Sequence, residues 1–317
     1  MKNIYCCVCL ALLLPYYGFA QNEAHFTMFM YNKLLYNPAY AGSRDVTSVN
    51  ADDRDQWNNI NGAPKTLNLT ADGPVGSYMG TFRKVALGIS LSSEQIGVEK
   101  NTNLMAYYAY RIKFKNSVLS FGLSGGGKLY SANYSELNPY QQYDPNLTNN
   151  IKNEFLPNFG AGVYWSADRF YAGFSVPNLL EDYYDKIKIN DEESREIRGY
   201  YLNCGYVFTA TDIIKIQPQI LARYSGDAGY SLPVNCDFNV SVIAYDRLMF
   251  GLTYRTDKSF EGIVHVQATR NINVGFAYDY LASGLNGYSG GTYEVVVGYD
   301  FVRDNSKYAP PRFVRTF

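Results

Sequence analysis

Ile272-Asn-Val-Gly-Phe-Ala-Tyr-Asp-Tyr280 alternates between large apolar or aromatic side chains and small or polar ones. This period of two predicts a β-strand, with Asn273, Gly275, Ala277 and Asp279 on one face. The segments that begin at Arg247 and Thr292 repeat the pattern. Large apolar residues on one face and small or polar residues on the other are typical of a strand between lipid and a polar lumen.

The connectors between the expected strands alternate in length from about residue 85 onward. The short ones are Lys115-Asn116, Ser166-Ala167-Asp168, 209–212, Tyr245-Asp246 and Arg270-Asn271, and the longer ones are 130–155, 176–198, 225–232, 256–259 and 283–290. Tight turns at one end of an up-and-down sheet and long loops at the other are typical of an outer-membrane β-barrel. A soluble, secreted β-sandwich would also alternate, with its apolar face turned inward, but the connector pattern favours the barrel.

The pattern predicts an all-β, up-and-down antiparallel transmembrane barrel of about 14 strands. The expected strands are 46–52, 64–71, 84–92, 103–115, 117–129, 156–165, 169–175, 199–210, 214–225, 233–244, 247–256, 260–270, 272–282 and 291–302. Eleven residues at a tilt of about 45° span about 25 Å, the height of a barrel's apolar band. Twelve strands remain an alternative, because the first, second and seventh are less regular. An even number places both termini on the periplasmic side.

Four regions are expected along the chain. Residues 1–20 have a positive start, an apolar core and Gly18-Phe-Ala20, which predicts a signal peptide cut before Gln21. Residues 21–43 are too apolar for a free tail, so we expect them to pack inside the lumen or along its periplasmic mouth. The barrel should occupy 44–302, followed by a periplasmic tail over 303–317. After residue 20 the chain has no run of 18 apolar residues, so no membrane-spanning helix is predicted.

Composition bounds the possible partners and the covalent links. The formal net charge of −1 gives no electrostatic case for nucleic acid. The 31 tyrosines suit the interface between lipid and water. Cys204 and Cys236 are expected on the eighth and tenth strands, about 9–10 Å apart, which is too far for a disulfide.

Histidine is scarce, and no constellation for catalysis is evident. His25 and His265 are the only two histidines, and neither has a second metal ligand at a useful spacing. Gly122-Leu-Ser-Gly-Gly-Gly127 resembles a phosphate-binding loop only loosely, because no helix follows it. We expect these glycines to relieve crowding on the lumen face or to bend the strand. We therefore expect no enzyme activity, no cofactor and no metal site.

Several local strings together resemble one protein family. They begin with Tyr31-Asn-Lys-Leu-Leu-Tyr-Asn-Pro-Ala-Tyr-Ala-Gly-Ser43, then Arg54-Asp-Gln-Trp57 and Gly62-Ala-Pro-Lys-Thr66. Softer matches follow at 108–112, 157–164, 171–177 and 291–294. The chain resembles the PorP/SprF family of type IX secretion system outer-membrane proteins from about Gln21 to its end. Lys33 departs from the family pattern, which usually has proline after the asparagine.

The resemblance implies a place in the cell outer membrane and a role in exporting or anchoring a secreted or surface-attached partner protein, or in gliding motility. Type IX secretion components and outer-membrane lipid are the other implied partners. A channel of the fatty-acid-transporter type, for small apolar solutes, remains the alternative.

Eight residues are candidate partner contacts. Asn37, Pro38, Tyr40 and Gly42 belong to the first family string, in which Asn37-Pro38 and Ala41-Gly42 are expected to make turns. Arg54 and Trp57 are expected near an external loop, where a guanidinium and a large ring are good contact anchors. Alternatively, Trp57 lies in the interface belt and Arg54 pairs with Asp52 or Asp53. Arg312 and Phe313 lie in the tail, which either contacts periplasmic components or is a disordered end.

Overall fold

The computed structural model describes residues 25–76, 83–137, 150–181, 183–189, 192–195, 198–226, 233–282 and 287–302. The predicted signal peptide and the tail with Arg312 and Phe313 lie outside these ranges. Among the described residues, the helices are α2 (Lys33–Tyr36), η1 (Pro38–Tyr40) and η2 (Tyr134–Glu136). None of them has the length or the apolarity of a membrane span.

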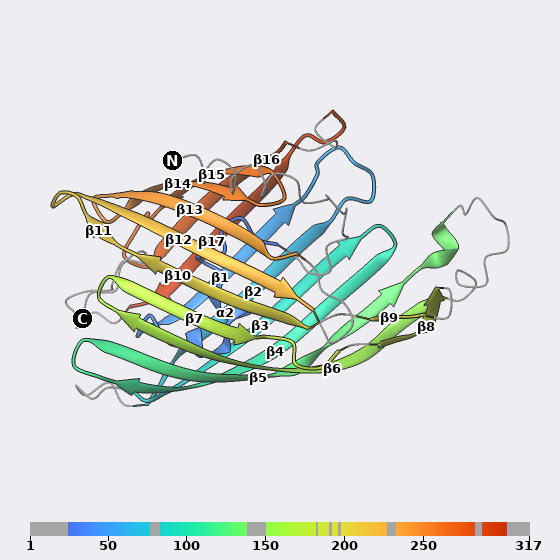
Figure 1. Cartoon of the computed structure of the whole chain (residues 1–317), viewed down its shortest axis with the longest axis horizontal. Coiled ribbons are helices and arrows are strands. Elements are labelled where there is room, and N and C mark those ends of the chain that lie inside the picture. The colour runs from blue at the N-terminus through green and yellow to red at the C-terminus, as the bar shows by residue number, and fades with distance from the viewer. Residues whose placement is uncertain are drawn as a thin grey trace, which may run out of the picture.

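The strands form one closed, antiparallel wall (Figure 1). β1 pairs with β17, and β10 pairs with β12, so the sheet has no free end. Its 15 strands include the two-residue β11, which continues β10 past Val207, so 14 strands surround the lumen. This confirms the predicted barrel and its strand number. The strands are β1 (Thr47–Asp55), β2 (Lys65–Val75), β3 (Val85–Ile96), β4 (Glu99–Lys113), β5 (Ser117–Ala132), β6 (Ile151–Ala167), β7 (Phe170–Val176), β10 (Gly199–Tyr206), β11 (Phe208–Thr209), β12 (Ile214–Ser225), β13 (Asn235–Ala244), β14 (Leu248–Arg255), β15 (Ser259–Val266), β16 (Ile272–Leu281) and β17 (Thr292–Phe301).

The two faces of the wall follow the predicted alternation. On β16, Phe276 is 46% exposed while its neighbour Ala277 is fully buried. On β14, Leu252 is 73% exposed and Thr253 only 3%. Apolar side chains therefore face outward on the strands, and small or polar ones face the lumen. This arrangement excludes a sandwich, in which the large apolar side chains would be buried between two layers.

The two ends of the barrel differ. We call the end with the connectors 114–116, 168–169 and 245–247 the turn end, and the opposite end, with 56–64, 133–150 and 177–198, the loop end. The small β8–β9 hairpin (Tyr183–Ile189 and Glu192–Arg195) forms its own sheet within the last of these connectors.

Two loop-end connectors are shorter than expected. β14 and β15 are joined by only 256–258, which was expected among the longer loops, and β3 and β4 by Gly97-Val98. β3 and β4 also extend beyond their predicted ends at residues 92 and 103. The added residues are mostly polar on both faces, so no period of two marks them in the sequence. Gly97 has a φ of +57°, which a tight hairpin requires at such a position.

β12 separates the two cysteines, as predicted. Cys204 lies on β10 and Cys236 on β13, and both are free thiols. The break between β10 and β11 lies next to Pro218 of β12, which pairs with neither of them. Because proline has no N–H, it cannot donate to the ladder there, and Val207 instead donates to the carbonyl of Arg169.

Candidate functional site: a plug in the lumen

Residues 25–46 lie inside the barrel, and we call them the plug. Figure 1 shows this blue segment, with α2, enclosed by the strands. Phe26, Met28 and Phe29 are at most 3% exposed. They belong to a buried apolar cluster with lumen-facing residues of the wall, which are Tyr201, Val207, Leu221, Ile243, Met249, Ile263, Ala277 and Val296. Burying each large apolar side chain stabilises the plug by about 1.5–3 kcal/mol.

The loop-end half of the plug is held by charge-assisted hydrogen bonds. Arg54 of β1 donates to Glu294 of β17 at 2.8 Å, to Asp279 of β16 at 2.7 Å and to the hydroxyl of Thr27 at 2.6 Å. The Glu294 carboxylate also accepts from the backbone N–H groups of Thr27 and Met28, at 2.7 and 2.9 Å. Thr27 in turn donates to Asp279. One buried cation and two carboxylates thus fix the plug to three strands.

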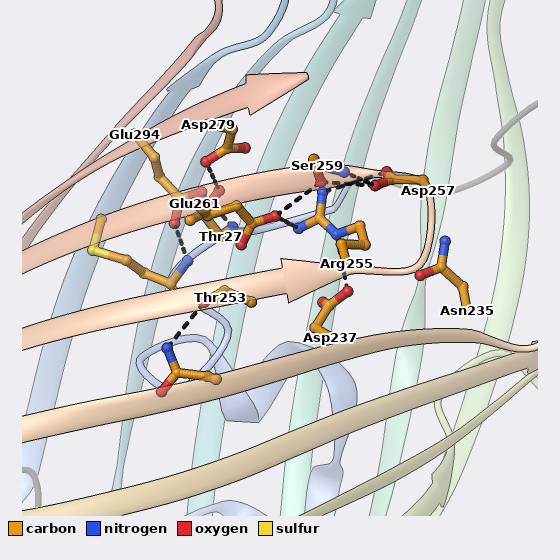
Figure 2. A network of polar contacts seen from close by, with 12 residues as sticks. Thr27, Asn235, Asp237, Thr253, Arg255, Asp257, Ser259, Glu261, Asp279 and Glu294 are labelled. Atoms are coloured by element: carbon orange, nitrogen blue, oxygen red, sulfur yellow. Dashed lines mark hydrogen bonds and ion pairs between the residues drawn. The ribbon is translucent and has the colours of Figure 1, made fainter. Parts of the chain in front are cut away.

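A second ion-pair chain continues around the lumen wall (Figure 2). Arg255 pairs with Asp237 at 2.9 Å and with Glu261 at 2.7 Å. Arg223 pairs with the same aspartate at 2.7 Å. All four residues are at most 6% exposed. In a low-dielectric interior each of these charges depends on its partner, because a buried charge without a partner costs several kcal/mol.

The part of the plug around η1 is held by shape rather than by charge. Asn37 caps η1 by accepting from the N–H of Ala39 at 2.9 Å, and its amide donates to the carbonyl of Val163 at 3.0 Å. A Cβ added to Gly122 would lie 2.1 Å from the backbone nitrogen of Ala39, and one added to Gly162 would lie 2.3 Å from the Asn37 side chain. Only glycine at these two positions lets the plug backbone come this close to β5 and the Asn37 side chain come this close to β6. This glycine cradle agrees with the predicted relief of crowding on the lumen face.

Lys33 lies in the middle of the plug, against aromatic rings. Its Nζ is 3.6 Å from the ring centre of Tyr171 and 5.8 Å from that of Tyr40. Burial lowers the pKa of Lys33 from 10.5 to about 7. The π face of Tyr171 acts in the opposite direction, because it favours the protonated amine. Lys33 therefore occupies the lumen at a desolvation cost.

The plug joins β1 through anchors at the turn end. Gly42 has a φ of +67°, and its N–H donates to Asp72 at 2.7 Å. Arg44 is bidentate on Asp300, and Asp45 pairs with the fully buried Arg111. These contacts fix the direction in which the chain leaves the lumen.

A small cavity lies beside the middle of the plug. A cavity of about 10 Å³ is lined by Met30, Tyr31, Leu34, Tyr40, Arg44, Asn50, Thr70 and Asp72. This volume is enough for about one water molecule. His265 fills the lumen near β15 and β16, where it stacks on Tyr31 at 4.3 Å and lies 3.2 Å from the Asn273 side-chain oxygen. Within the described ranges, no group of three or more His, Cys, Asp or Glu side chains could hold a metal ion.

The structure separates the candidate contact residues into two groups. Asn37, Pro38 and Gly42 are buried inside the barrel, and Tyr40 is half-buried, with its ring edge-on to Tyr164. They position the plug.

Arg54 is only 2% exposed and lies on β1, two positions before the loop-end connector 56–64, with its side chain turned into the lumen. Its expected alternative partners Asp52 and Asp53 are also replaced, by Asp279 and Glu294. The first strand was expected to end at residue 52, but β1 continues to Asp55, with Asp52 and Arg54 buried on its inward face. Trp57 is the one described candidate that lies in a loop-end connector. It is half-buried, and its backbone N–H donates to Thr292 Oγ1 at 3.2 Å.

Several residues that hold the plug were not among the candidates. Asp279 and Glu294 were recognised only as members of polar strand faces, and Thr27 was not singled out. The Arg54–Glu294 contact joins residues 240 positions apart. An inward carboxylate in an apolar strand is a local signal that a buried cation is needed, but nothing local identifies which cation.

A closed 14-stranded barrel with an apolar outer face and a filled polar lumen defines an outer-membrane β-barrel protein. The family model described as type IX secretion system membrane protein PorP/SprF matches residues 18–299. The chain therefore belongs to the PorP/SprF family, which confirms the resemblance, and it resides in the outer membrane.

Similar solved structures are outer-membrane proteins of low sequence identity. Omp33 of Acinetobacter baumannii is 9% identical with a TM-score of 0.45, and the match covers 81% of this chain and 98% of that one. The NanC porin is 11% identical with a TM-score of 0.40, and the match covers 81% of this chain and 100% of that one. A porin of Rhodopseudomonas blastica is 10% identical with a TM-score of 0.36, over 81% of this chain and 99% of that one. No curated protein matches the chain.

Proposed function

We propose that this protein is a non-enzymatic barrel of the type IX secretion system that assists the export or surface anchoring of a partner protein. Membership of the PorP/SprF family supports a role in the type IX secretion system. The observation that carries the finer role is the plug, which fills the lumen from Phe26 to Arg44 and is bonded to the wall at both of its ends. A barrel filled in this way is suited to binding at its rim rather than to conducting solutes.

The orientation of the barrel is part of the proposal. Outer-membrane barrels have short turns at the periplasmic end and longer loops outside. We therefore assign the turn end to the periplasm and the loop end to the cell exterior. The turn end is then available to secretion components, and the loop end to the partner.

Deletion of the gene tests this function directly. We expect a specific large protein to leave the cell surface while the other outer-membrane proteins stay at their normal levels. Mass spectrometry of surface-biotinylated cells measures the change and identifies the partner. An unchanged surface proteome, together with unchanged motility, would contradict the proposal.

The solute channel is the competing function, and conductance separates the two. The purified barrel in a planar bilayer should show no steady single-channel current, because the plug occupies the lumen. A steady current, or flux of small apolar solutes into liposomes, would favour the channel of fatty-acid-transporter type instead.

A further inference from the structure

Three neighbouring strands extend beyond the height of the bilayer. β4, β5 and β6 have 15, 16 and 17 residues, whereas β14 to β17 have 8 to 10. With the usual rise and tilt, 16 residues span about 37 Å, against an apolar band of about 25 Å. In Figure 1, β5 and β6 run far to the right, toward the loop end. We call residues 98–101, 128–137 and 150–156 the projection.

The projection has its own small core. Tyr130, Ala132, Tyr134 and Ile151 are buried together, with Val98 and Leu156 against them. Hydrogen bonds brace its outer side, where Asn150 donates to Asn133 at 2.7 Å and Ser135 donates to the same oxygen at 2.7 Å. Because it has a core and a bonded surface, the projection is a rigid support for a binding site.

A cleft of about 460 Å³ lies on this support. It is lined by Val98, Lys100, Ser131, Ala132, Asn133, Ser135, Asn150, Ile151 and Lys152. The two lysines are its only charged lining residues, and both are exposed. Neither lysine is in an ion pair with another described residue. The volume lies in the range of sites that bind small molecules or a few side chains.

We propose that this cleft binds an acidic segment of the partner protein, with Lys100 and Lys152 pairing with its carboxylates. The inference rests on the proposed function, which supplies a partner at the loop end. Charge complementarity selects the segment, because the described lining of the cleft has two lysines without an ion-pair partner among the described residues and has no carboxylate, while the neighbouring Glu136 is bonded to Asn133. The hydroxyl and amide groups of Ser135, Asn133 and Asn150 add hydrogen-bonding capacity beside them.

Charge reversal tests the inference in cells. The partner is first identified as the protein that leaves the surface in the deletion strain. We then expect the double variant K100E/K152E to retain at least five-fold less partner than the wild type. The conservative variant K100R/K152R should retain it. The control K65E/K258E changes two exposed lysines of other loop-end segments by the same charge and should also retain it.

A zero-length carbodiimide cross-link supplies the second readout. It joins an amine to a carboxylate only when the two are in contact. On wild-type cells, peptides containing Lys100 or Lys152 should be linked to Asp or Glu of the partner. K100R/K152R should lose this link and keep the partner, because arginine holds the charge without a reactive amine. The cross-link decides the question if K100E/K152E fails to reach the outer membrane in its folded, heat-modifiable form.

The failures are distinguishable. If deletion removes no surface protein, the proposed function is wrong, and the inference falls with it. If deletion removes the partner but K100E/K152E retains it, only the cleft assignment is overturned. Equal loss in K65E/K258E would show a general effect of surface charge and would also overturn it. The assignment would also be overturned if the two lysines bound lipopolysaccharide phosphate, gave no carbodiimide cross-link to the partner, and could be changed in K100E/K152E without loss of the partner.

Discussion

The two halves of the plug are held in the same lumen by different physics. Near the loop end, Thr27 and Met28 are bonded to a buried carboxylate that Arg54 neutralises. Nearer the turn end, Asn37 and Ala39 lie on a glycine cradle with only neutral hydrogen bonds, and ion pairs return only where the plug joins β1, at Arg44 and Asp45. The first half depends on charge balance, and the second depends on the closeness of two backbones.

This difference predicts how each half can be loosened. An ion pair fails when one partner is removed, because the other stays buried and unpaired. A cradle fails when something is added, because the backbone above it cannot move aside without losing its own contacts. Deleting atoms at the loop end and adding atoms at the turn end should therefore have the same result.

One thiol can report on both halves. Met30 lies between them and is 9% exposed. Met30→Cys, with Cys204 and Cys236 changed to serine and with Cys6, Cys7 and Cys9 removed by cleavage of the predicted signal peptide, leaves a single buried thiol in the plug. Its labelling by a polar maleimide measures how often the plug leaves its place. Each 1.4 kcal/mol lost from the plug should raise the labelling rate about tenfold.

Arg54→Met should have the largest effect. It leaves Asp279 and Glu294 buried without their cation, at a cost of about 3–5 kcal/mol. The labelling rate should rise at least 100-fold. Lys65→Met is the matched control, because its pair with Asp55 at 3.0 Å is 70% and 49% exposed and is worth little. Equal rates in the two variants would show that charge does not hold the loop-end half.

Gly122→Ala should come next. Its new Cβ cannot fit 2.1 Å from the nitrogen of Ala39, and overpacking of this kind costs about 1–3 kcal/mol. We expect labelling to rise roughly ten- to 100-fold. Gly125→Ala on the same strand is the control, because its Cβ would meet only the ring of Phe159, at 3.4 Å. An unchanged labelling rate in Gly122→Ala would mean that the close approach contributes nothing to plug binding.

Asn37→Ala should weaken the turn-end half more modestly. It removes the cap on η1 and the bond to the Val163 carbonyl, for about 1–2 kcal/mol in total. Asn37→Ser restores a capping oxygen and should recover part of this loss. If the Asn37→Ser variant is labelled as fast as the Asn37→Ala variant, the hydrogen bond from Asn37 to the Val163 carbonyl of β6 accounts for the loss.

Lys33→Met should have the opposite sign. It replaces a buried amine with an apolar chain of similar length, so the plug should become more stable near pH 7 and the labelling rate should fall. Because the pKa of Lys33 falls from 10.5 outside the lumen to about 7 within it, the wild-type plug should become more stable as the pH rises above 7. Below pH 7 its full penalty is present.

The pH series needs a reference, because maleimide chemistry itself depends on pH. The ratio of the wild-type labelling rate to the Lys33→Met rate removes that dependence. This ratio should fall between pH 7 and pH 9. A flat ratio would indicate that Tyr171 holds the amine in its charged form over the whole range.

The strands that cross the bilayer were predictable, and the ends outside it were not. Within the lipid, each outward position must be apolar, so the alternation of apolar and polar side chains from Ile272 to Tyr280 is visible in the sequence alone. Beyond the lipid that constraint ends, and the polar residues that extend β3 and β4 to Ile96 and Glu99 have no such mark. Arg54 was expected beyond the end of its strand for a different reason, because nothing local shows that an arginine has buried carboxylate partners.

By itself, the sequence determined the class of fold, the number of strands and their two faces. These follow from neighbours one and two residues apart, whose alternation lipid enforces along each strand. The apolar segment before the first strand was also expected in the lumen or at its mouth, and only the tertiary structure decided which wall residues hold it there. Closure of the sheet brings Arg54 to Glu294 and Gly122 to Ala39, and such contacts depend on the register of the whole wall rather than on any local pattern.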